Sequence, residues 1–481
     1  MQLPQRWASL GREALFPADT DGRDRFAFLM LLAFILVAPW LGSARLPALL
    51  NGLLTPVGRL LVPAFGFAIG AAAFSSRSSF RSLRPLAVPL GSLLGIALLG
   101  ALQLAPLPDR AFGLVAPVNL EIYHETAEIL SLYGKTPPLP RVSLAPEETA
   151  GSVLRLGGYA VLLAAAAQLL RTRPRRRVFV GTLLTAACLH VVAAGVVLAG
   201  GGPFRGAFGS AEDFGDYLLV ILPLAFGAFW AAILTNSDRG RDAVDRAERL
   251  EQQLSPVVAR GLAFATLMAG IALTGSGGNV AAGTVAIGFL LALASRRRRR
   301  KRPAGAVATG VTASLLLAAR VNAVPLAALE LGGDMGRRLA VWRASLDAWH
   351  RFPILGTGLG AFRDAFRRVQ PRELSGFVDT AQSDLLQILV TGGAVGALAA
   401  VVACASLLAV LLRLWKEQKH REESAMALAG VGALAALGLD GLVEFNLGAP
   451  AVPATLACVL GLAVAAGLGS PREPSAAPQT P

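Results

Sequence analysis

The sequence has few charged residues for its length. Asp, Glu, Lys and Arg make up 16% of its 481 residues, whereas soluble globular chains average about 25%. Hydrophobic residues make up 54% of the chain, an excess that is typical of proteins that lie in a lipid bilayer. The composition therefore predicts an integral membrane protein.

Cysteine is also scarce. The three cysteines, Cys188, Cys404 and Cys458, lie in apolar stretches without the spacing of metal ligands, so we expect neither a disulfide nor a metal site. The formal net charge is +14, but the basic residues fall in short clusters between apolar stretches. A nucleic-acid-binding protein gathers its basic residues on one face, so we expect no nucleic-acid partner and interpret the clusters as signals of membrane orientation.

Apolar stretches follow one another along most of the chain. A helix needs about 20 apolar residues to cross the hydrocarbon core, and twelve stretches approach that length: 26–42, 60–76, 86–106, 153–170, 178–200, 217–234, 259–275, 278–295, 304–320, 385–412, 425–443 and 449–468. Lys and Arg gather in alternate connections, and cytoplasmic connections are the ones enriched in these residues. We predict an all-α membrane protein with about twelve transmembrane helices and both termini cytoplasmic.

This assignment divides the chain into five parts. In order, they are a cytoplasmic N-terminal segment (1–25), spans one to nine with a periplasmic loop at 107–152 (26–320), a large periplasmic loop (321–384), spans ten to twelve (385–468) and a disordered cytoplasmic tail (469–481).

The large loop is rich in arginine and has a helical pattern. Nine arginines and six acidic residues lie within 320–383, a balance that attracts a polyanion such as a pyrophosphate. Leu339, Trp342, Leu346 and Trp349 recur at helical spacing and predict an apolar stripe on the membrane face, while Arg338 and Arg343 project at other angles.

The segment after this predicted helix contains three alternating glycines, Gly356, Gly358 and Gly360. Such a segment could cradle a phosphate, or it could form a tight turn. It is not a dinucleotide-binding fingerprint, because no strand precedes it.

Other candidate side chains lie at the ends of predicted spans. Arg205 follows a Gly-rich stretch and could hold a phosphate through its forked guanidinium, or it could extend to lipid headgroups. Asp384 lies at the start of the tenth span, where an acidic side chain beside the bilayer is costly and indicates function.

Six segments together resemble the bacterial O-antigen ligase and polymerase superfamily of polytopic membrane glycosyltransferases. In chain order they are SLAPEETAGSVLRLGGYAVLL, GAFGSAEDFGDYLLVILPLA, LTGSGGNVAA, RLAVWRASLDAWHRFPILGTGLGAF, AQSDLLQILVTGGAVG and LVEFNLGAPA. The fourth is similar to the family pattern Arg-x-x-x-Trp-x-x-Ala followed by Pro-x-x-Gly-x-Gly. The resemblance covers about residues 140–460.

The resemblance implies transfer of a glycan from undecaprenyl pyrophosphate to a sugar or lipid acceptor, at the periplasmic face of the inner membrane. It implies neither a cofactor nor a metal, and a chain-length regulator is a possible protein partner. Arginines would neutralise the leaving pyrophosphate, and a base would take the acceptor proton. The expected substrate-binding residues are Arg205, Trp342, Gly356, Gly358, Arg363 and Gln382, and the expected catalytic residues are Arg338, Arg343 and Asp384, with Asp379 or His350 as other bases.

Two positions depart from the family pattern. Gly277 stands where the family has an arginine, and Gln382 stands where the family often has a histidine. We therefore favour a polysaccharide polymerase over an O-antigen ligase. A transporter, or a non-catalytic protein that binds the lipid-linked glycan, is the alternative of another class. A transporter would place ionisable residues at mid-membrane, where His190 is almost the only one expected.

Overall fold

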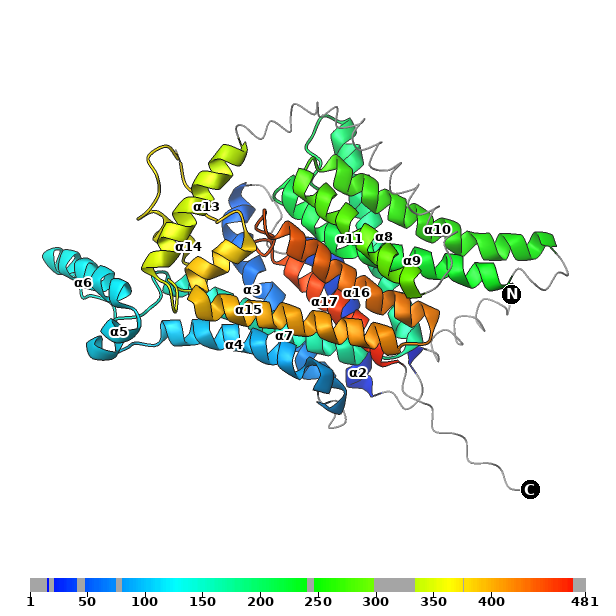
Figure 1. Cartoon of the computed structure of the whole chain (residues 1–481), viewed down its shortest axis with the longest axis horizontal. Helices are drawn as coiled ribbons and strands as arrows, with labels where there is room; N and C mark the ends of the chain where they lie inside the picture. The colour runs from blue at the N-terminus through cyan, green and yellow to red at the C-terminus, as the bar shows by residue number, and fades with distance from the viewer. Residues whose placement is uncertain are drawn as a thin grey trace, which may run out of the picture.

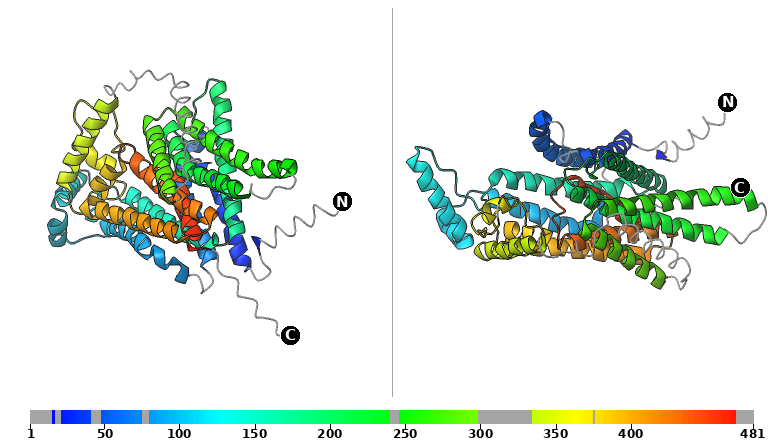
Figure 2. Two further views of the ribbon diagram at one scale, coloured as in Figure 1. Left: turned by 45° about the vertical axis from the view of Figure 1, so that its right-hand side comes forward. Right: turned by 90° about the horizontal axis from the view of Figure 1, so that it is seen from above.

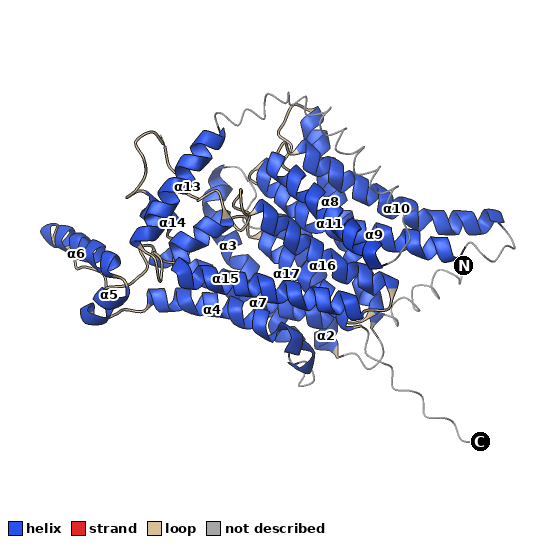
Figure 3. Cartoon of the chain, viewed as in Figure 1, coloured by secondary structure: helices blue, strands red, loops and turns tan. Residues whose placement is uncertain are grey.

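The computed structural model describes residues 15–16, 21–40, 48–74, 80–239, 246–297, 334–374 and 376–469. Within these ranges the chain is helical (Figure 3), apart from loops and one isolated β-bridge between Pro106 and Arg141. The prediction of an all-helical protein is confirmed.

Nine helices of the described residues are long and apolar enough to cross a membrane. They are α4 (Ala87–Leu104), α7 (Pro146–Leu169), α8 (Arg173–Ala199), α9 (Ala211–Arg239), α10 (Arg246–Leu273), α11 (Gly277–Arg297), α15 (Asp384–Glu417), α16 (Arg421–Asp440) and α17 (Ala451–Leu468). Each corresponds to one of the twelve predicted spans.

The other three predicted spans have different outcomes. The span 26–42 corresponds to α2 (Gly22–Val37), whose 16 residues are fewer than the roughly 20 that a crossing needs. The span 60–76 corresponds to α3 (Ala48–Ala73), of which Leu60–Ala73 forms a shorter apolar helix. The span 304–320 lies outside the described residues.

The centre of the bundle is formed by α9, α16 and α17, the most buried of the nine helices. Small residues let these helices approach closely, as is usual between helices in a membrane. A side chain at Gly461 of α17 would lie 2.8 Å from the backbone oxygen of Leu163 in α7. The bundle is therefore held together by close backbone packing as well as by large apolar side chains.

Four short helices gather at one end of the bundle, which we call the α13 end (Figures 1 and 2). They are α5 (Asp109–Val115), α6 (Pro117–Leu132), α13 (Asp334–Arg351) and α14 (Phe362–Phe366). Ile122 of α6 belongs to the same buried cluster as Val341, Phe362 and Phe366. The two segments predicted as separate loops therefore share a small apolar core.

Helix α15 is broken in its first third. Gly393 has φ 62° and ψ −166°, and the N–H groups of Ala394 and Val395 donate to the carbonyls of Pro353 and Ile354 at 2.8 and 3.3 Å. Backbone groups freed by a break in an apolar helix need such partners. The segment after α13 supplies them, so the break fixes this segment against α15.

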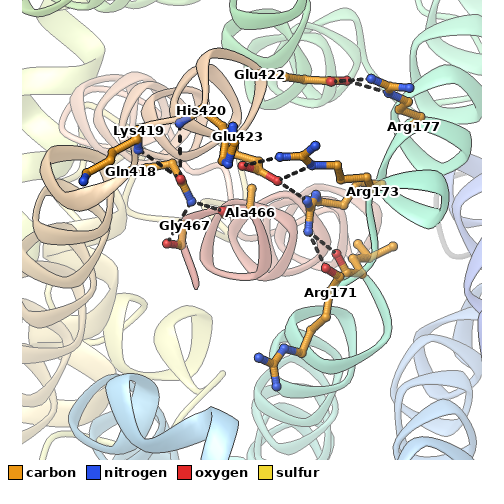
Figure 4. Close-up of polar contacts among 12 residues, drawn as sticks. Arg171, Arg173, Arg177, Gln418, Lys419, His420, Glu422, Glu423, Ala466 and Gly467 are labelled. Atoms are coloured by element: carbon orange, nitrogen blue, oxygen red, sulfur yellow. Dashed lines mark hydrogen bonds and ion pairs between the residues drawn. The ribbon is translucent and has the colours of Figure 1, made fainter. Parts of the chain in front are cut away.

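The opposite end of the bundle carries a network of ion pairs (Figure 4). Glu423 of α16 accepts from Arg173 and Arg176 of α8, each at 2.8 Å, and Glu422 pairs with Arg177 at 2.8 Å. We predicted this arginine cluster only as an orientation signal. It also ties the first turn of α8 to the first turn of α16.

Candidate functional site

The candidate site lies at the α13 end, where α13 meets the start of α15 and the loop after α16. Arg338 of α13 makes the most direct of these contacts. Its guanidinium donates to the carbonyl of Val443 at 2.6 Å and to Oε1 of Glu444 at 2.7 Å. The two charged side chains are only 15% and 14% exposed. Arg338 therefore fixes the loop after α16, and its charge is shared with an acidic side chain.

Asp384, the first residue of α15, binds the same loop. Its Oδ1 accepts from the backbone N–H groups of Asn446 and Leu447 at 3.2 and 3.4 Å. Its own N–H lies 2.7 Å from the carbonyl of Gly441 and 3.2 Å from that of Glu444. Asp384 therefore fixes residues 441–447 against the start of α15, and its Oδ1 accepts from two backbone N–H groups.

Gln382 lies two residues before α15 in an unusual backbone conformation. Its φ is 51°, which is uncommon for a residue other than glycine. The indole N–H of Trp342 donates to its carbonyl at 3.3 Å, whereas its buried Oε1 has no hydrogen-bond partner among the described residues. The structure therefore brings together the predicted residues Trp342 and Gln382, which are 40 positions apart.

The buried face of α13 differs from the predicted apolar stripe. Val341, Ala344, Ser345 and Ala348 are buried against the protein, whereas Leu339 and Leu346 are 40% and 39% exposed. The small residues form the narrow contact with the neighbouring segments and the leucines point away from it, so the placement of Leu339 and Leu346 on the membrane face stays a prediction.

Arg343 lies between these two exposed leucines. At helical spacing, positions 339, 343 and 346 share one face, and the side chain of Arg343 is exposed. It makes no ion pair with a described acidic residue. This face of α13 therefore presents a cation flanked by apolar side chains.

Arg205 and Arg363 lie apart from Arg338. Arg205, in the loop before α9, donates to the carbonyl of Gly209 at 3.4 Å. Arg363 is exposed on α14. No contact in the described part of the chain joins Arg205 or Arg363 to the Arg338–Glu444 pair.

The glycine segment forms a tight turn. Gly356, Gly358 and Gly360 have φ values of 71°, 109° and 92°. The N–H groups of Thr357 and Gly358 donate to Val390 and Thr391 of α15 at 3.1 and 3.0 Å.

The N–H of Leu359 donates in turn to Oε1 of Gln103 at 3.0 Å. These three backbone donors are engaged within the protein, so the phosphate cradle expected at Gly356 and Gly358 does not fit the geometry. The tight turn, the other interpretation of this segment, does.

Two buried acids in the site carried no predicted role. Asp216 of α9 is 3% exposed and Asp440, the last residue of α16, is 1% exposed. We call them the acid pair. The signal for Asp440 was present in the sequence, because an acid inside the predicted span 425–443 is costly in a bilayer. Within the described residues, no group of three or more His, Cys, Asp or Glu side chains is placed to hold a metal ion.

The comparisons with known proteins bear on the same end of the molecule. No curated protein matches the chain. A family model described as O-antigen ligase matches residues 262–401, which include α11, α13, α14 and the start of α15 with its break. The match supports the resemblance drawn from the motifs: residues 262–401 are similar to the O-antigen ligase family.

Proposed function

We propose that this protein is a membrane polysaccharide polymerase, which transfers a glycan from a polyprenyl pyrophosphate to a sugar acceptor at the α13 end. The observation that carries the proposal is the overlap between the family match at residues 262–401 and the helices that build this end. The break in α15 and the bond from Trp342 to Gln382 both lie within that overlap.

The exposed face of α13 suits the donor. A polyprenyl pyrophosphate joins a long apolar chain to a dianionic or more highly charged headgroup. Arg343 offers a cation between Leu339 and Leu346, which are 40% and 39% exposed. A guanidinium can bind two phosphate oxygens at once. We therefore assign pyrophosphate binding to Arg343, with Arg205 as a second phosphate ligand and Arg363 as a further candidate for that role.

Arg338 has a different part in this proposal. Its guanidinium is held by Glu444 and by the carbonyl of Val443, so it shapes the loop that faces the reacting groups. Its remaining positive charge lies near the leaving group and stabilises negative charge that develops there. Trp342 and Gln382 hold the start of α15 beside it.

The proposal places the α13 end on the periplasmic side of a bacterial inner membrane. Cysteine introduced at Asp379, which is exposed at this end, should react in intact cells with a thiol reagent that cannot cross the membrane. The variant is made in a background without the three native cysteines. Cysteine at Arg177, at the opposite end, serves as the control and should react only after the membrane is opened.

A deletion strain tests the reaction itself. Loss of a polymerase should leave surface glycan of a single repeat unit. Loss of an O-antigen ligase, the alternative that the family match equally allows, should leave long glycan chains that are not attached to the lipid acceptor. Unchanged glycan in both length and attachment would contradict both enzymatic assignments.

A further inference from the structure

The acid pair lies where three helix ends meet. Asp216 is in the second turn of α9, and Asp440 is the last residue of α16. Gly278, in the first turn of α11, has no side chain there: a methyl group at this position would lie 3.0 Å from Oδ1 of Asp440. Asn279 of α11 lies beside Asp216.

Four buried oxygens of this cluster have no hydrogen-bond partner within the described residues. Neither carboxylate oxygen of Asp440, nor Oδ1 of Asp216, nor Oδ1 of the fully buried Asn279 has a hydrogen-bond partner among the described residues. Each nearby amide donates one N–H to a backbone carbonyl, Asn446 to that of Leu437 at 3.2 Å and Asn279 to that of Glu212 at 3.4 Å, while Asn446 also lies beside Asp440 and Asn279 beside Asp216. A buried polar atom without a partner is rare in native proteins and calls for an explanation.

The charges around the acid pair make the cluster more unusual still. Asp213, Asp384 and Glu444 add acidic side chains that interact with one or other member of the pair. Among the described residues, Arg338 is the cation that interacts with Asp440, and it is already paired with Glu444. Asp440 also lies at the C-terminus of a helix, where the helix dipole disfavours an acid. Burial, like charge and helix position therefore all oppose a structural role for Asp440.

The other candidate bases are less suitable. Asp384 uses Oδ1 to hold two backbone N–H groups, and Gln382 cannot accept a proton at neutral pH. Asp379 and His350 are exposed to solvent, away from the enclosed surroundings in which a positioned base works best.

We propose that the acid pair accepts the proton that the acceptor sugar loses during glycan transfer, with Asp440 as the residue nearest the reacting hydroxyl. The acceptor oxygen forms a bond to the anomeric carbon of the donor, and the bond from that carbon to the phosphate oxygen breaks. The electron pair of that bond leaves with the pyrophosphate, and the hydroxyl proton passes to the carboxylate. Two facing carboxylates can share this proton as one unit. The inference rests on the proposed glycan transfer and names a proton acceptor for it.

In this proposal the acceptor reaches the acid pair past Arg338 and Glu444, the charged side chains that interact with Asp440. These side chains are 15% and 14% exposed, and Glu444 interacts with both members of the pair.

Asp440→Asn in the full-length purified protein gives the sharpest test. The rate of transfer is measured against pH with a synthetic polyprenyl-pyrophosphate repeat unit as donor and the same repeat unit as acceptor. Because a positioned base contributes roughly 10²–10⁴-fold, the rate should fall at least 100-fold and the pH dependence seen in the wild type should be lost. Asp440→Glu should restore part of the rate.

The thermal midpoint separates this role from a structural one. Asp440→Asn removes an uncompensated buried charge, so the midpoint should stay the same or rise while the rate falls. A residue that only stabilised the fold would lower both. Asp216→Asn removes the like charge beside Asp440, so it should move the pH profile of transfer to lower pH without abolishing the pH dependence.

Two neighbouring glycines, Gly277 and Gly278, test the position of Asp440 without a change to any acidic residue. Gly278→Ala places its methyl group 3.0 Å from Oδ1 of Asp440 and 3.6 Å from Cγ of Glu444, whereas Gly277→Ala meets nothing within 4 Å. The first should slow transfer about tenfold, and the second should leave the rate unchanged. This comparison decides the question if Asp440→Asn does not fold.

The outcomes separate the inference from the function on which it rests. A wild-type protein that transfers glycan while Asp440→Asn keeps its rate and pH profile overturns the inference alone. Equal rates for Gly278→Ala and Gly277→Ala do the same. A wild-type protein that transfers glycan to neither a sugar nor a lipid acceptor overturns the proposed function, and the inference with it.

Discussion

The indole N–H of Trp342 donates a hydrogen bond to the backbone carbonyl of Gln382 at 3.3 Å. This bond joins α13 to a residue with φ 51° directly before the first turn of α15. The side chain of Gln387 supports the same turn by accepting from the N–H of Ala381 at 2.8 Å. This hydrogen bond fixes the position of α13, an arginine-rich helix outside the bundle, relative to the membrane-length helix α15.

Trp342→Phe should shorten the polymer, because it keeps an aromatic ring but removes the indole N–H that holds Gln382. The lost bond should cost about 1 kcal/mol of stability. Trp349→Phe is the matched control: it removes a bond of 3.2 Å from the same helix to the carbonyl of Pro353, away from Gln382. Glycan length on gels and thermal unfolding measure the two effects. Equal glycan length in the two variants would show that the Gln382 contact has no role in the reaction.

Arg338→Ala and Arg343→Ala should both reduce polymer formation, but only Arg343→Ala should weaken binding of a lipid pyrophosphate analogue. Arg343 is exposed between two leucines, whereas Arg338 is held by Glu444. Arg338→Ala should instead lower stability by about 3 kcal/mol, because it removes the guanidinium that binds Glu444 and the carbonyl of Val443 in a largely buried contact. Equal weakening of analogue binding, with stable protein, would contradict this division.

Much of this arrangement could be predicted from the sequence, and part of it could not. The helical spacing of residues 337–351 predicted α13, and the long apolar runs predicted the nine membrane-length helices. The buried face of α13 was missed, because Ala344, Ser345 and Ala348 carry a weak apolar signal beside Leu339 and Leu346. The contact partner, not the hydrophobicity of α13, decides which face is buried.

The acid pair shows a second limit of prediction from the sequence. Asp216 and Asp440 are more than 200 positions apart, and they meet only because α9 and α16 pack side by side in the centre of the bundle. The glycine turn shows a third, since a phosphate cradle and a tight turn share the same sequence pattern. Only the partners of its N–H groups, Val390, Thr391 and Gln103, distinguish the two.

Gly358→Ala should severely destabilise the protein, by more than about 2 kcal/mol. The backbone there has φ 109°, and the added methyl group would lie 2.9 Å from Cα of Ser143. Gly134→Ala is the control, since Gly134 has φ 67° with nothing within 4 Å and should lose only the roughly 1 kcal/mol of left-handed strain. Protein level in the membrane and thermal unfolding in detergent report both. Equal losses would mean that the turn is not packed as described.

Arg205→Lys should lose most of the transfer activity, because an ammonium group cannot form the forked contact to two phosphate oxygens. Arg205→Ala should lose at least as much, at a normal protein level. Arg110→Ala, an exposed arginine of α5, is the control and should have no effect. Full glycan length in the Arg205→Ala strain would show that this side chain only reaches lipid headgroups.

Glycan transfer at the α13 end can be measured with the purified wild-type protein in lipid nanodiscs and a labelled polyprenyl-pyrophosphate repeat unit. We expect a ladder of glycans that grows by whole repeat units, with one polyprenyl pyrophosphate released for each unit added, and no ladder with Arg343→Ala. Unchanged donor in the wild-type reaction, or an undiminished ladder with Arg343→Ala, would show that this end of the protein does not transfer glycan as proposed.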